Sequence, residues 1–184
     1  MRPGARLTTS RTSPGRLCAI LLLILAITLV APKNRIEALS SARIGLISQN
    51  CASIKQSLKT LQKADSRTRV HLGTTYQNIL TNYITPLNLR LVRNDTPNTD
   101  LTRLQTEFSA ARDDFATKFI KYSQSLEELI ATNCQAQPDV FYTKLESTRA
   151  LRHTVSASVA HLDQLLSAHL AAVSNLKDSL KESL

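Results

Sequence analysis

Residues 138–183 read PDVFYTKLESTRALRHTVSASVAHLDQLLSAHLAAVSNLKDSLKES, and this stretch decides the fold. Apolar residues recur in it at intervals of three or four, apart from one step bridged by Thr148. That spacing is the period of an α-helix with one apolar face. Pro138 suits the first position of a helix, and Asp139 suits its first turn. The pattern predicts one helix over 138–183 with the apolar stripe Phe141, Leu145, Leu151, Val155, Val159, Leu162, Leu166, Leu170, Val173, Leu176 and Leu180.

A second helix is predicted over 99–132, after the turn sequence Thr96-Pro97-Asn98-Thr99 and with Asp100 in its first turn. Its apolar residues follow a nearly heptad pattern. The polar residues 133–137 connect it to the helix at 138–183, and so short a connection makes the two helices run antiparallel. The predicted stripe is Leu101, Leu104, Phe108, Ala111, Phe115, Phe119, Tyr122, Leu126 and Leu129.

The first half of the chain is less regular but predicts helical structure over about 36–93. Polar residues at 64–69 interrupt its apolar pattern, with Gly73 close behind. Either one long helix carries a polar seam there, or the helix is kinked or broken near residues 64–73. Pro86 should bend the last turns, because it lacks an N–H and clashes with the preceding turn. The two apolar stripes on either side of the interruption are Ile47, Cys51, Ile54, Leu58 and Leu61, then Leu72, Tyr76, Ile79, Tyr83, Leu87 and Leu91.

The glycine content narrows the fold class. The chain has four glycines in 184 residues, and Gly4 and Gly15 precede the helical region. Tight turns and phosphate-binding loops use glycine for its positive φ angles, so a doubly wound nucleotide fold, a P-loop or a many-stranded barrel is disfavoured. The sequence therefore predicts an all-α protein, an elongated antiparallel bundle of three long helices, or four if the first is broken, occupying 33–184.

The N-terminal segment predicts export. Residues 1–16 carry four arginines and no acid, and residues 17–31 (LCAILLLILAITLVA) are uncharged. A basic segment before an apolar one is typical of a signal sequence, and the arginines should stay in the cytoplasm. Fifteen residues are short for a membrane span, which favours cleavage, but Pro32 follows the best cleavage site, which favours an uncleaved anchor. The expected location is a single-pass membrane protein with its bundle outside, or a secreted protein.

Charge is distributed unevenly along the chain, whose formal net charge is +9. Residues 1–16 contribute +4, residues 33–93 contribute +8 and residues 94–184 contribute −3. In one interpretation the halves pack together, and the acids at 113–114 and 127–128 face basic residues. In the other, a basic face contacts anionic lipid or an anionic surface polymer. The residues of that face would be Lys55, Lys59, Lys63, Arg67 and Arg69. Nucleic acid is not an expected partner, since no aromatic residues interleave with these cations.

Cys51 and Cys134 are predicted to form a disulfide. An even pair of cysteines in an exported chain is commonly bonded. Folding the chain about residue 96 places Cys134 opposite residue 58, an offset of about 10 Å from Cys51 at ~1.5 Å per residue. A kink or an asymmetric turn would absorb that offset.

The sequence contains none of the common motifs for catalysis or cofactor binding. His153, His161 and His169 rotate around a helix by about 80° per step, so they do not converge on one metal ion. No Glu-x-x-His, His-Glu-x-x-His, Cys-x-x-Cys or Gly-x-Ser-x-Gly motif is present. We therefore expect no enzyme activity, no cofactor and no small-molecule substrate. The expected role is that of an adaptor or spacer at the cell envelope, with a protein partner or a second copy on the C-terminal helix; the alternative is a module that senses a ligand or binds anionic lipid or polymer.

Overall fold

The computed structural model describes residues 33–182, and the side chains of residues 41–182. All regular elements in this part of the chain are helices, so the predicted all-α class is confirmed. The predicted basic segment 1–16 and apolar segment 17–31 lie outside the described residues. Within the described part, no helix has both the length and the apolar character needed to span a membrane.

The chain divides into two compact units at Gly45 and Leu46. The described part of the first unit is the beginning of helix α2 (Lys33–Gln49), and the second unit contains all the later helices. The side chain of Asn50, directly after α2, bonds back to the Leu46 carbonyl at 2.9 Å. The backbone N–H of Asn50 bonds to the same carbonyl at 3.0 Å, and Asn50 is the single residue between the end of α2 and the start of the next helix.

The second unit begins with three consecutive helical elements: α3 (Cys51–Ile79), the π-helical turn η1 (Leu80–Ile84) and α4 (Thr85–Arg93). The expectation of one helix over 36–93, with a possible break near 64–73, needs correction. α3 passes through residues 64–73 without interruption, and Gly73 is helical with no positive φ. The discontinuities lie instead at Asn50 and in η1. The interruption in the apolar pattern at 64–69 is thus a polar seam on a continuous helix.

Pro86 gives a physical reason for the π turn. A proline has no N–H to donate to the carbonyl four residues earlier, and its ring crowds that turn. The backbone widens just before it, where the Thr85 N–H bonds to the Leu80 carbonyl five residues back. The predicted distortion by Pro86 is therefore a single wide turn directly ahead of it, rather than a bend in the turns that follow.

The wide turn also changes which side chains are buried. The buried positions along this stretch are Tyr76, Leu80, Ile84 and Asn88, at even steps of four. In a regular α-helix, each step of four residues rotates the side-chain direction by about 40° about the helix axis. A π turn has more than four residues per turn, so it offsets this rotation and keeps the buried residues on one face. Tyr83, which the periodicity placed on the apolar stripe, is consequently 70% exposed.

The remaining helices are α5 (Thr99–Ala131) and α6 (Pro138–Glu182), where the periodicity gave 99–132 and 138–183. The side chain of Asn98 caps α5 by accepting a hydrogen bond from the Leu101 N–H at 3.0 Å. The turn before it reverses the chain at Asp95, whose φ is 52°. All nine residues of the predicted α5 stripe are buried, so this helix has one strictly apolar face.

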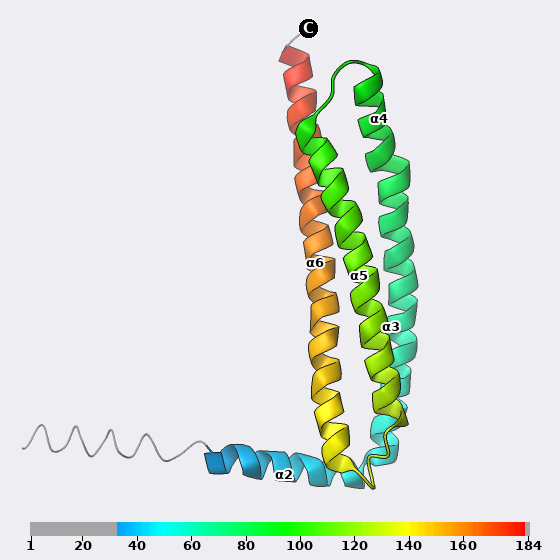
Figure 1. Cartoon of the computed structure of the whole chain (residues 1–184), viewed down its shortest axis with the longest axis vertical. Helices are drawn as coiled ribbons and strands as arrows, with labels where there is room; N and C mark the ends of the chain where they lie inside the picture. Colours follow the sequence, from blue (N-terminus) through cyan, green and yellow to red (C-terminus); the bar gives the residue numbers. More distant parts are fainter. Residues whose placement is uncertain (1–32, 183–184) are drawn as a thin grey trace, which may run out of the picture. The chain divides into compact units, whose positions relative to one another are not determined.

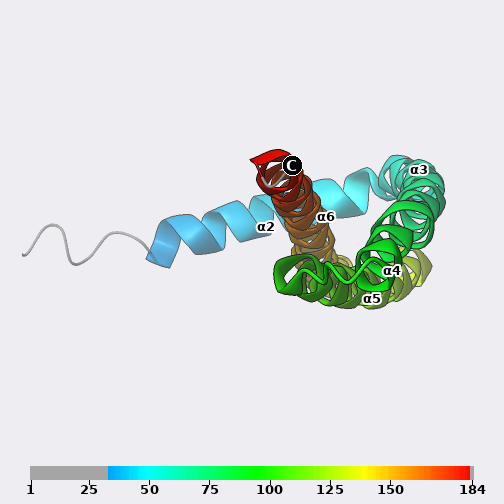
Figure 2. The ribbon, with the colours of Figure 1, turned by 90° about the horizontal axis from the view of Figure 1, so that it is seen from above.

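The helices of the second unit form an elongated array in which α5 lies between α3–α4 and α6 (Figure 1, Figure 2). The chain ascends through α3 and α4, descends through α5 and ascends again through α6, so α3 and α6 run in the same direction (Figure 1). α5 contacts both neighbours, but no Cα atom of α6 lies within 8 Å of α3, η1 or α4. Seen from above, the helices therefore follow an open arc rather than a closed triangle (Figure 2).

An aromatic row on α5 fills the middle of the array. Tyr76 of α3 meets Phe108 and Phe115 edge to face, with ring centroids 6.1 and 5.8 Å apart. Phe119 and Tyr122 continue the row at 5.7 Å. Such edge-on pairs add about 0.5–1.5 kcal/mol each to the stabilisation from burial alone. Phe115, Phe119 and Tyr122 of this row also border the space between α3 and α6.

Candidate functional site: a disulfide-braced groove

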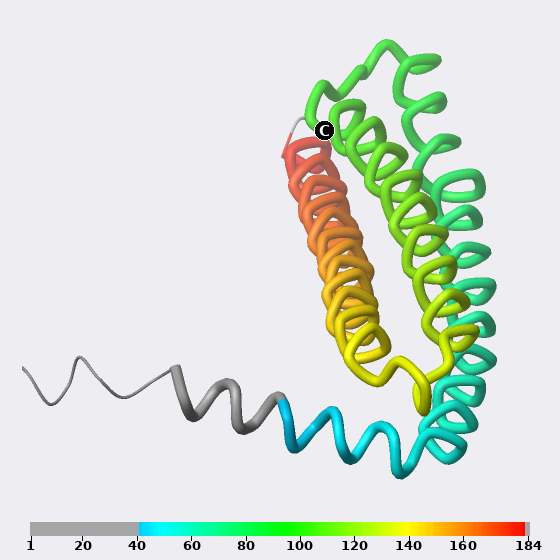
Figure 3. Tube along the Cα trace, turned by 60° about the horizontal axis from the view of Figure 1, so that its bottom comes forward, coloured from blue at the N-terminus to red at the C-terminus, as the bar shows by residue number. Residues whose placement is uncertain are grey.

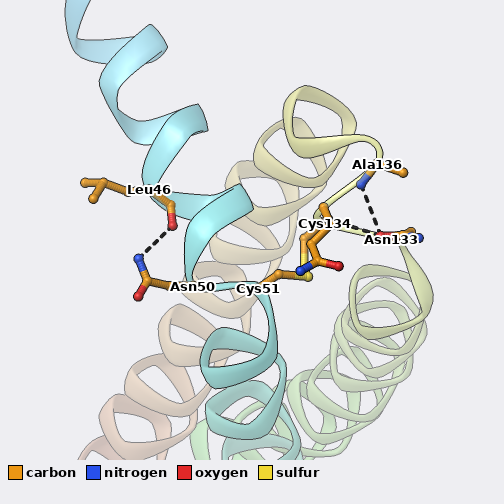
Figure 4. The surroundings of a disulfide bond; sticks show 7 residues. Leu46, Asn50, Cys51, Asn133, Cys134 and Ala136 are labelled. Carbon is orange, nitrogen blue, oxygen red and sulfur yellow. Dashed lines mark hydrogen bonds between the residues drawn. A yellow bond between two sulfur atoms is a disulfide. The ribbon is translucent and has the colours of Figure 1, made fainter.

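A disulfide between Cys51 and Cys134 closes one end of the array (Figure 4). Their Cα atoms are 5.5 Å apart, and both side chains are buried. The side-chain oxygen of Asn133 accepts hydrogen bonds from the N–H groups of Gln135 and Ala136, each at 3.1 Å, and so shapes the loop that carries Cys134. The predicted pairing is thus found, and it ties the start of α3 to the α5–α6 connection.

The expected offset between the cysteines is absorbed along the helices. At the opposite end, Asn88 of α4 lies level with Leu101, whose carbonyl accepts its side-chain N–H at 3.1 Å. From that level to the disulfide, α3, η1 and α4 use more residues than α5 does. The wide η1 turn accounts for part of the difference, because it holds more residues per turn than an α-helix.

A buried polar cluster joins three helices above the disulfide. The Tyr122 hydroxyl of α5 donates to the Asp65 carboxylate of α3 at 2.6 Å. The Arg152 guanidinium of α6 donates to both oxygens of the same carboxylate, at 3.1 and 3.2 Å. Burial and the neighbouring Asp65 charge raise the pKa of Tyr122, so its hydroxyl remains a donor at all ordinary pH values. In the described chain, Asp65–Arg152 is the ion pair that spans from α3 to α6.

Two hollows follow one another between the α3–η1–α4 wall and α6, and the lower one begins at this cluster; together they are called the groove here. The backbone of the helices on both sides can be followed in Figure 3. Its lower hollow has a volume of about 480 Å³ and lies over Phe115 and Phe119, between Leu72 and Val159. Its upper hollow has a volume of about 510 Å³ and is more apolar. The walls of the upper hollow are Ile79, Tyr83, Ile84, Pro86 and Leu87 on one side and Leu166, His169, Leu170 and Val173 on the other.

Part of the apolar stripe predicted for α6 lines the groove instead of the core. The residues that α6 buries in its second half are Leu162, Leu165 and His169. The predicted stripe positions Leu166, Leu170 and Val173 line the groove instead, and Leu170 is 62% exposed. α6 therefore has two apolar faces there, one against α5 and one open to solvent.

His169, which lines the upper hollow, and Asn88 of α4 are buried polar side chains without full hydrogen bonding. His169 is 5% exposed, and its Nε2 atom has no partner. Burial lowers the pKa of the His169 imidazole below its ordinary value of 6.5, so the ring is neutral at pH 7. Asn88 donates to the Gln105 side chain at 2.6 Å, but its Oδ1 atom is buried and unpaired. A buried polar atom without a hydrogen-bond partner lowers the free energy of unfolding by about 1–3 kcal/mol, and the chain carries this cost at both atoms.

The five basic residues predicted to face an anionic surface do not share one environment. Lys59, Lys63 and Arg67 are exposed at successive i,i+4 positions on α3, and Lys55, one step before them, is half-buried. Arg69 lies elsewhere, with its guanidinium 5.6 Å from the centre of the Phe119 ring. The structure thus keeps a stripe of four and separates Arg69 from it.

The acids expected to complement this basic half are paired within their own half. Asp113 pairs with Arg112, Asp114 with Lys118, and Glu128 with Lys144, within α5 or between α5 and α6. The interpretation in which these acids face the basic first half is therefore not what the structure has. In the residues described, no ion pair involves Lys59, Lys63 or Arg67.

The three histidines of α6 are not brought together, and the described side chains, residues 41–182, include no group of three or more His, Cys, Asp or Glu placed to hold a metal ion. Of the three tyrosines on the predicted stripes, Tyr76 and Tyr122 are in the core and Tyr83 is not. Neither the Asp65 cluster nor the second apolar face of α6 was predicted from the sequence. The lone acid within the basic run of α3 was the available signal for the former. Comparisons with protein-family models, curated proteins and solved structures found no match.

Proposed function

We propose that this chain is a non-catalytic interaction protein of the cell envelope, with an adaptor or spacer role outside the cytoplasmic membrane. The observation that carries this proposal is the groove, whose apolar walls stay open to solvent between α6 and the α3–η1–α4 wall. Contiguous apolar surface of this kind is typical of a binding site, since folding would otherwise bury it.

Two further features support the location. The Cys51–Cys134 bond belongs to an oxidising compartment, because cytosolic thiols are kept reduced. The basic segment 1–16 and the apolar segment 17–31 have the order of an export signal, which acts as an anchor if it is not cleaved and releases a secreted protein if it is.

Labelling with a membrane-impermeant maleimide tests the location. In a background that lacks Cys18, a Thr74→Cys variant places a thiol on an exposed position of α3. An Arg6→Cys variant places one in the basic segment. Thr74→Cys should react on intact cells or in the medium, and Arg6→Cys should react only after permeabilisation, unless the segment has been removed. If both thiols need permeabilisation, the bundle is inside the cell and the proposed location is wrong.

Native electrophoresis of gently extracted protein tests the interaction role. The chain should migrate in an assembly larger than itself. The paired change Tyr83→Glu and Leu170→Glu puts charges on both edges of the upper hollow and should release the chain from that assembly. Val70→Glu is the matched control, because Val70 is 69% exposed, close to the exposure of Tyr83, and does not line the groove. Equal behaviour of all variants would contradict the proposal.

The basic stripe supports a second candidate function, binding to anionic lipid or polymer. Like charges at i,i+4 destabilise a helix by about 0.2–0.5 kcal/mol per pair, and Lys59, Lys63 and Arg67 have no acidic partner among the residues described. An external anion would relieve that repulsion. The full proposed face adds Lys55 and Arg69.

Sedimentation with vesicles that contain phosphatidylserine tests this second candidate. Reversing Lys59, Lys63 and Arg67 to Glu should abolish binding at physiological salt, at about 1 kcal/mol per cation. A control with the same change in net charge reverses three cations elsewhere, at Lys121, Lys177 and Lys181. If the two triple variants lose binding to the same extent, net charge rather than the stripe is responsible.

A further inference from the structure

The groove has the dimensions of a helix-binding site. The two hollows together extend along α3, η1 and α4 from Asp65 to Arg90, and along α6 from Arg149 to Val173. Twenty-five residues of helix span roughly 38 Å, which is about seven turns. The helices on the two sides run in the same direction (Figure 1), and the antiparallel α5 lines the lower hollow with Phe115, Phe119 and Tyr122. This is the place that a fourth helix occupies in a four-helix bundle.

The edges of the groove require a wide occupant. Tyr83 and Leu170 line opposite walls of the upper hollow and are 70% and 62% exposed. A single acyl chain on the floor would leave both edges in water. A helix with its side chains is about 10–12 Å across and would cover both at once. The exposed edges therefore favour a helix over a lipid tail.

The charges along the groove describe the flanks of that helix. Arg90, Arg149 and Arg152 line the two hollows. Arg152 pairs with Asp65 and Arg149 pairs with Glu146, so Arg90 of the upper hollow is the lining arginine that has no acidic partner among the described residues. Acidic side chains beside an apolar face would complement it.

The unpaired atom in the upper hollow describes one further contact. His169 is neutral, more than nine-tenths buried and lines the apolar part of the groove, where its Nε2 atom lacks a partner. A hydroxyl or amide side chain on the occupant would provide that partner, since either group can donate or accept.

A second copy of the chain does not fit this shape. Outside the groove, the large exposed apolar side chains described on the second unit lie singly or in pairs, such as Val70 on α3, Leu89 and Val92 on α4 and Ile120 on α5. The second unit of another copy therefore offers no continuous apolar face that would fill both hollows. The occupant has to bring its own exposed apolar helix.

We infer that the groove binds an amphipathic helix of a different protein, about seven turns long, with an acidic flank beside Arg90 and one Ser, Thr, Asn or Gln opposite His169. This inference rests on the proposed interaction function and names the class of partner. It corresponds to helix-in-groove recognition, in which apolar residues at i, i+3, i+4 and i+7 enter the hollows.

Site-specific photo-cross-linking in the native cell tests the inference on the full chain. Benzoylphenylalanine replaces Tyr83 in one variant and Val70 in the control. The Tyr83 position should give one protein adduct that the Val70 position does not give, and mass spectrometry should map it to a segment with helical apolar periodicity and an acidic flank. A synthetic peptide of that segment should bind the purified chain. Leu170→Glu should weaken this binding by about tenfold or more, and Val70→Glu by less than about twofold.

The other outcomes overturn the helix-binding inference. An adduct with the mass of a lipid, an adduct with a second copy, or a mapped segment without helical apolar periodicity would each show a different occupant and leave the interaction function standing. Absence of any adduct specific to Tyr83, together with native migration as the chain alone, would remove both proposals. Absence of the adduct with the assembly retained would move the interaction away from the groove.

Discussion

The Asp65 cluster allows a quantitative prediction about what holds α3, α5 and α6 together. Replacing Asp65 with Ala leaves the Tyr122 hydroxyl, in a side chain that is 2% exposed, without its acceptor. A hydrogen bond to a charged group contributes about 1.5–3 kcal/mol. The more exposed Arg152 pair adds up to about 1 kcal/mol, because solvent screens it. We expect Asp65→Ala to lower the free energy of unfolding by about 3 kcal/mol.

Denaturant unfolding followed by circular dichroism measures this loss, and thermal unfolding should show a decrease in Tm of about 6–12 °C at ~2–4 °C per kcal/mol. Tyr122→Phe alone should cost less, since Asp65 keeps Arg152. The coupling energy from the double-mutant cycle should be at least about 1 kcal/mol. Arg149→Ala is the matched control, because Arg149 pairs only with the exposed Glu146 of its own helix.

A loss below about 0.5 kcal/mol for Asp65→Ala, or additive effects of Asp65→Ala and Tyr122→Phe, would refute the reasoning. The carboxylate would then gain as much from water as from the hydroxyl and the guanidinium. A similar loss in Arg149→Ala would show that general surface charge, rather than the cluster, determines the stability.

Three other changes have expected outcomes. Replacing Cys51 and Cys134 with Ala opens a loop with a sequence separation of 83 and should cost about 4.5 kcal/mol in the chain-entropy model, measured against the oxidised chain in guanidinium chloride. Gly73→Ala should stabilise by about 0.5–1 kcal/mol, since Gly73 is mid-helix and an added Cβ meets nothing within 4 Å; a loss in thermal unfolding would contradict the continuous α3. The lowered pKa of His169 means that the unfolded chain binds a proton more readily, so its contribution is complete above pH 6.5 and is lost as the pH falls through the lowered value. Unfolding free energies between pH 5 and pH 7.5 should decrease toward acid in the natural chain, and a His169→Leu variant should show a smaller decrease.

The sequence by itself determined the features that depend on local periodicity and spacing. All nine apolar positions predicted for α5 are buried, because α5 is a regular helix that packs against the helices on both of its sides. The starts of α5 and α6 follow from Asn98 and Pro138, whose effects on the first turn are local. The all-α class and the cysteine pairing were available in the same way, from the glycine content and from an even pair of cysteines that follows a segment typical of export.

Only the tertiary structure decided which side chains of the outer helices reach the core. The π turn before Pro86 buries Ile84 and leaves Tyr83 exposed. A prediction made with a fixed helical period does not include such a turn. From the sequence, the polar run at 64–69 was compatible with either a break or a polar seam. In the structure it is a seam, where Tyr122 and Arg152, distant in sequence, are the partners of Asp65. On α6, one apolar pattern became a buried face and an open one. α5 packs between α6 and the α3–η1–α4 wall, so no Cα atom of that wall lies within 8 Å of α6, and the second apolar face of α6 stays open toward the groove.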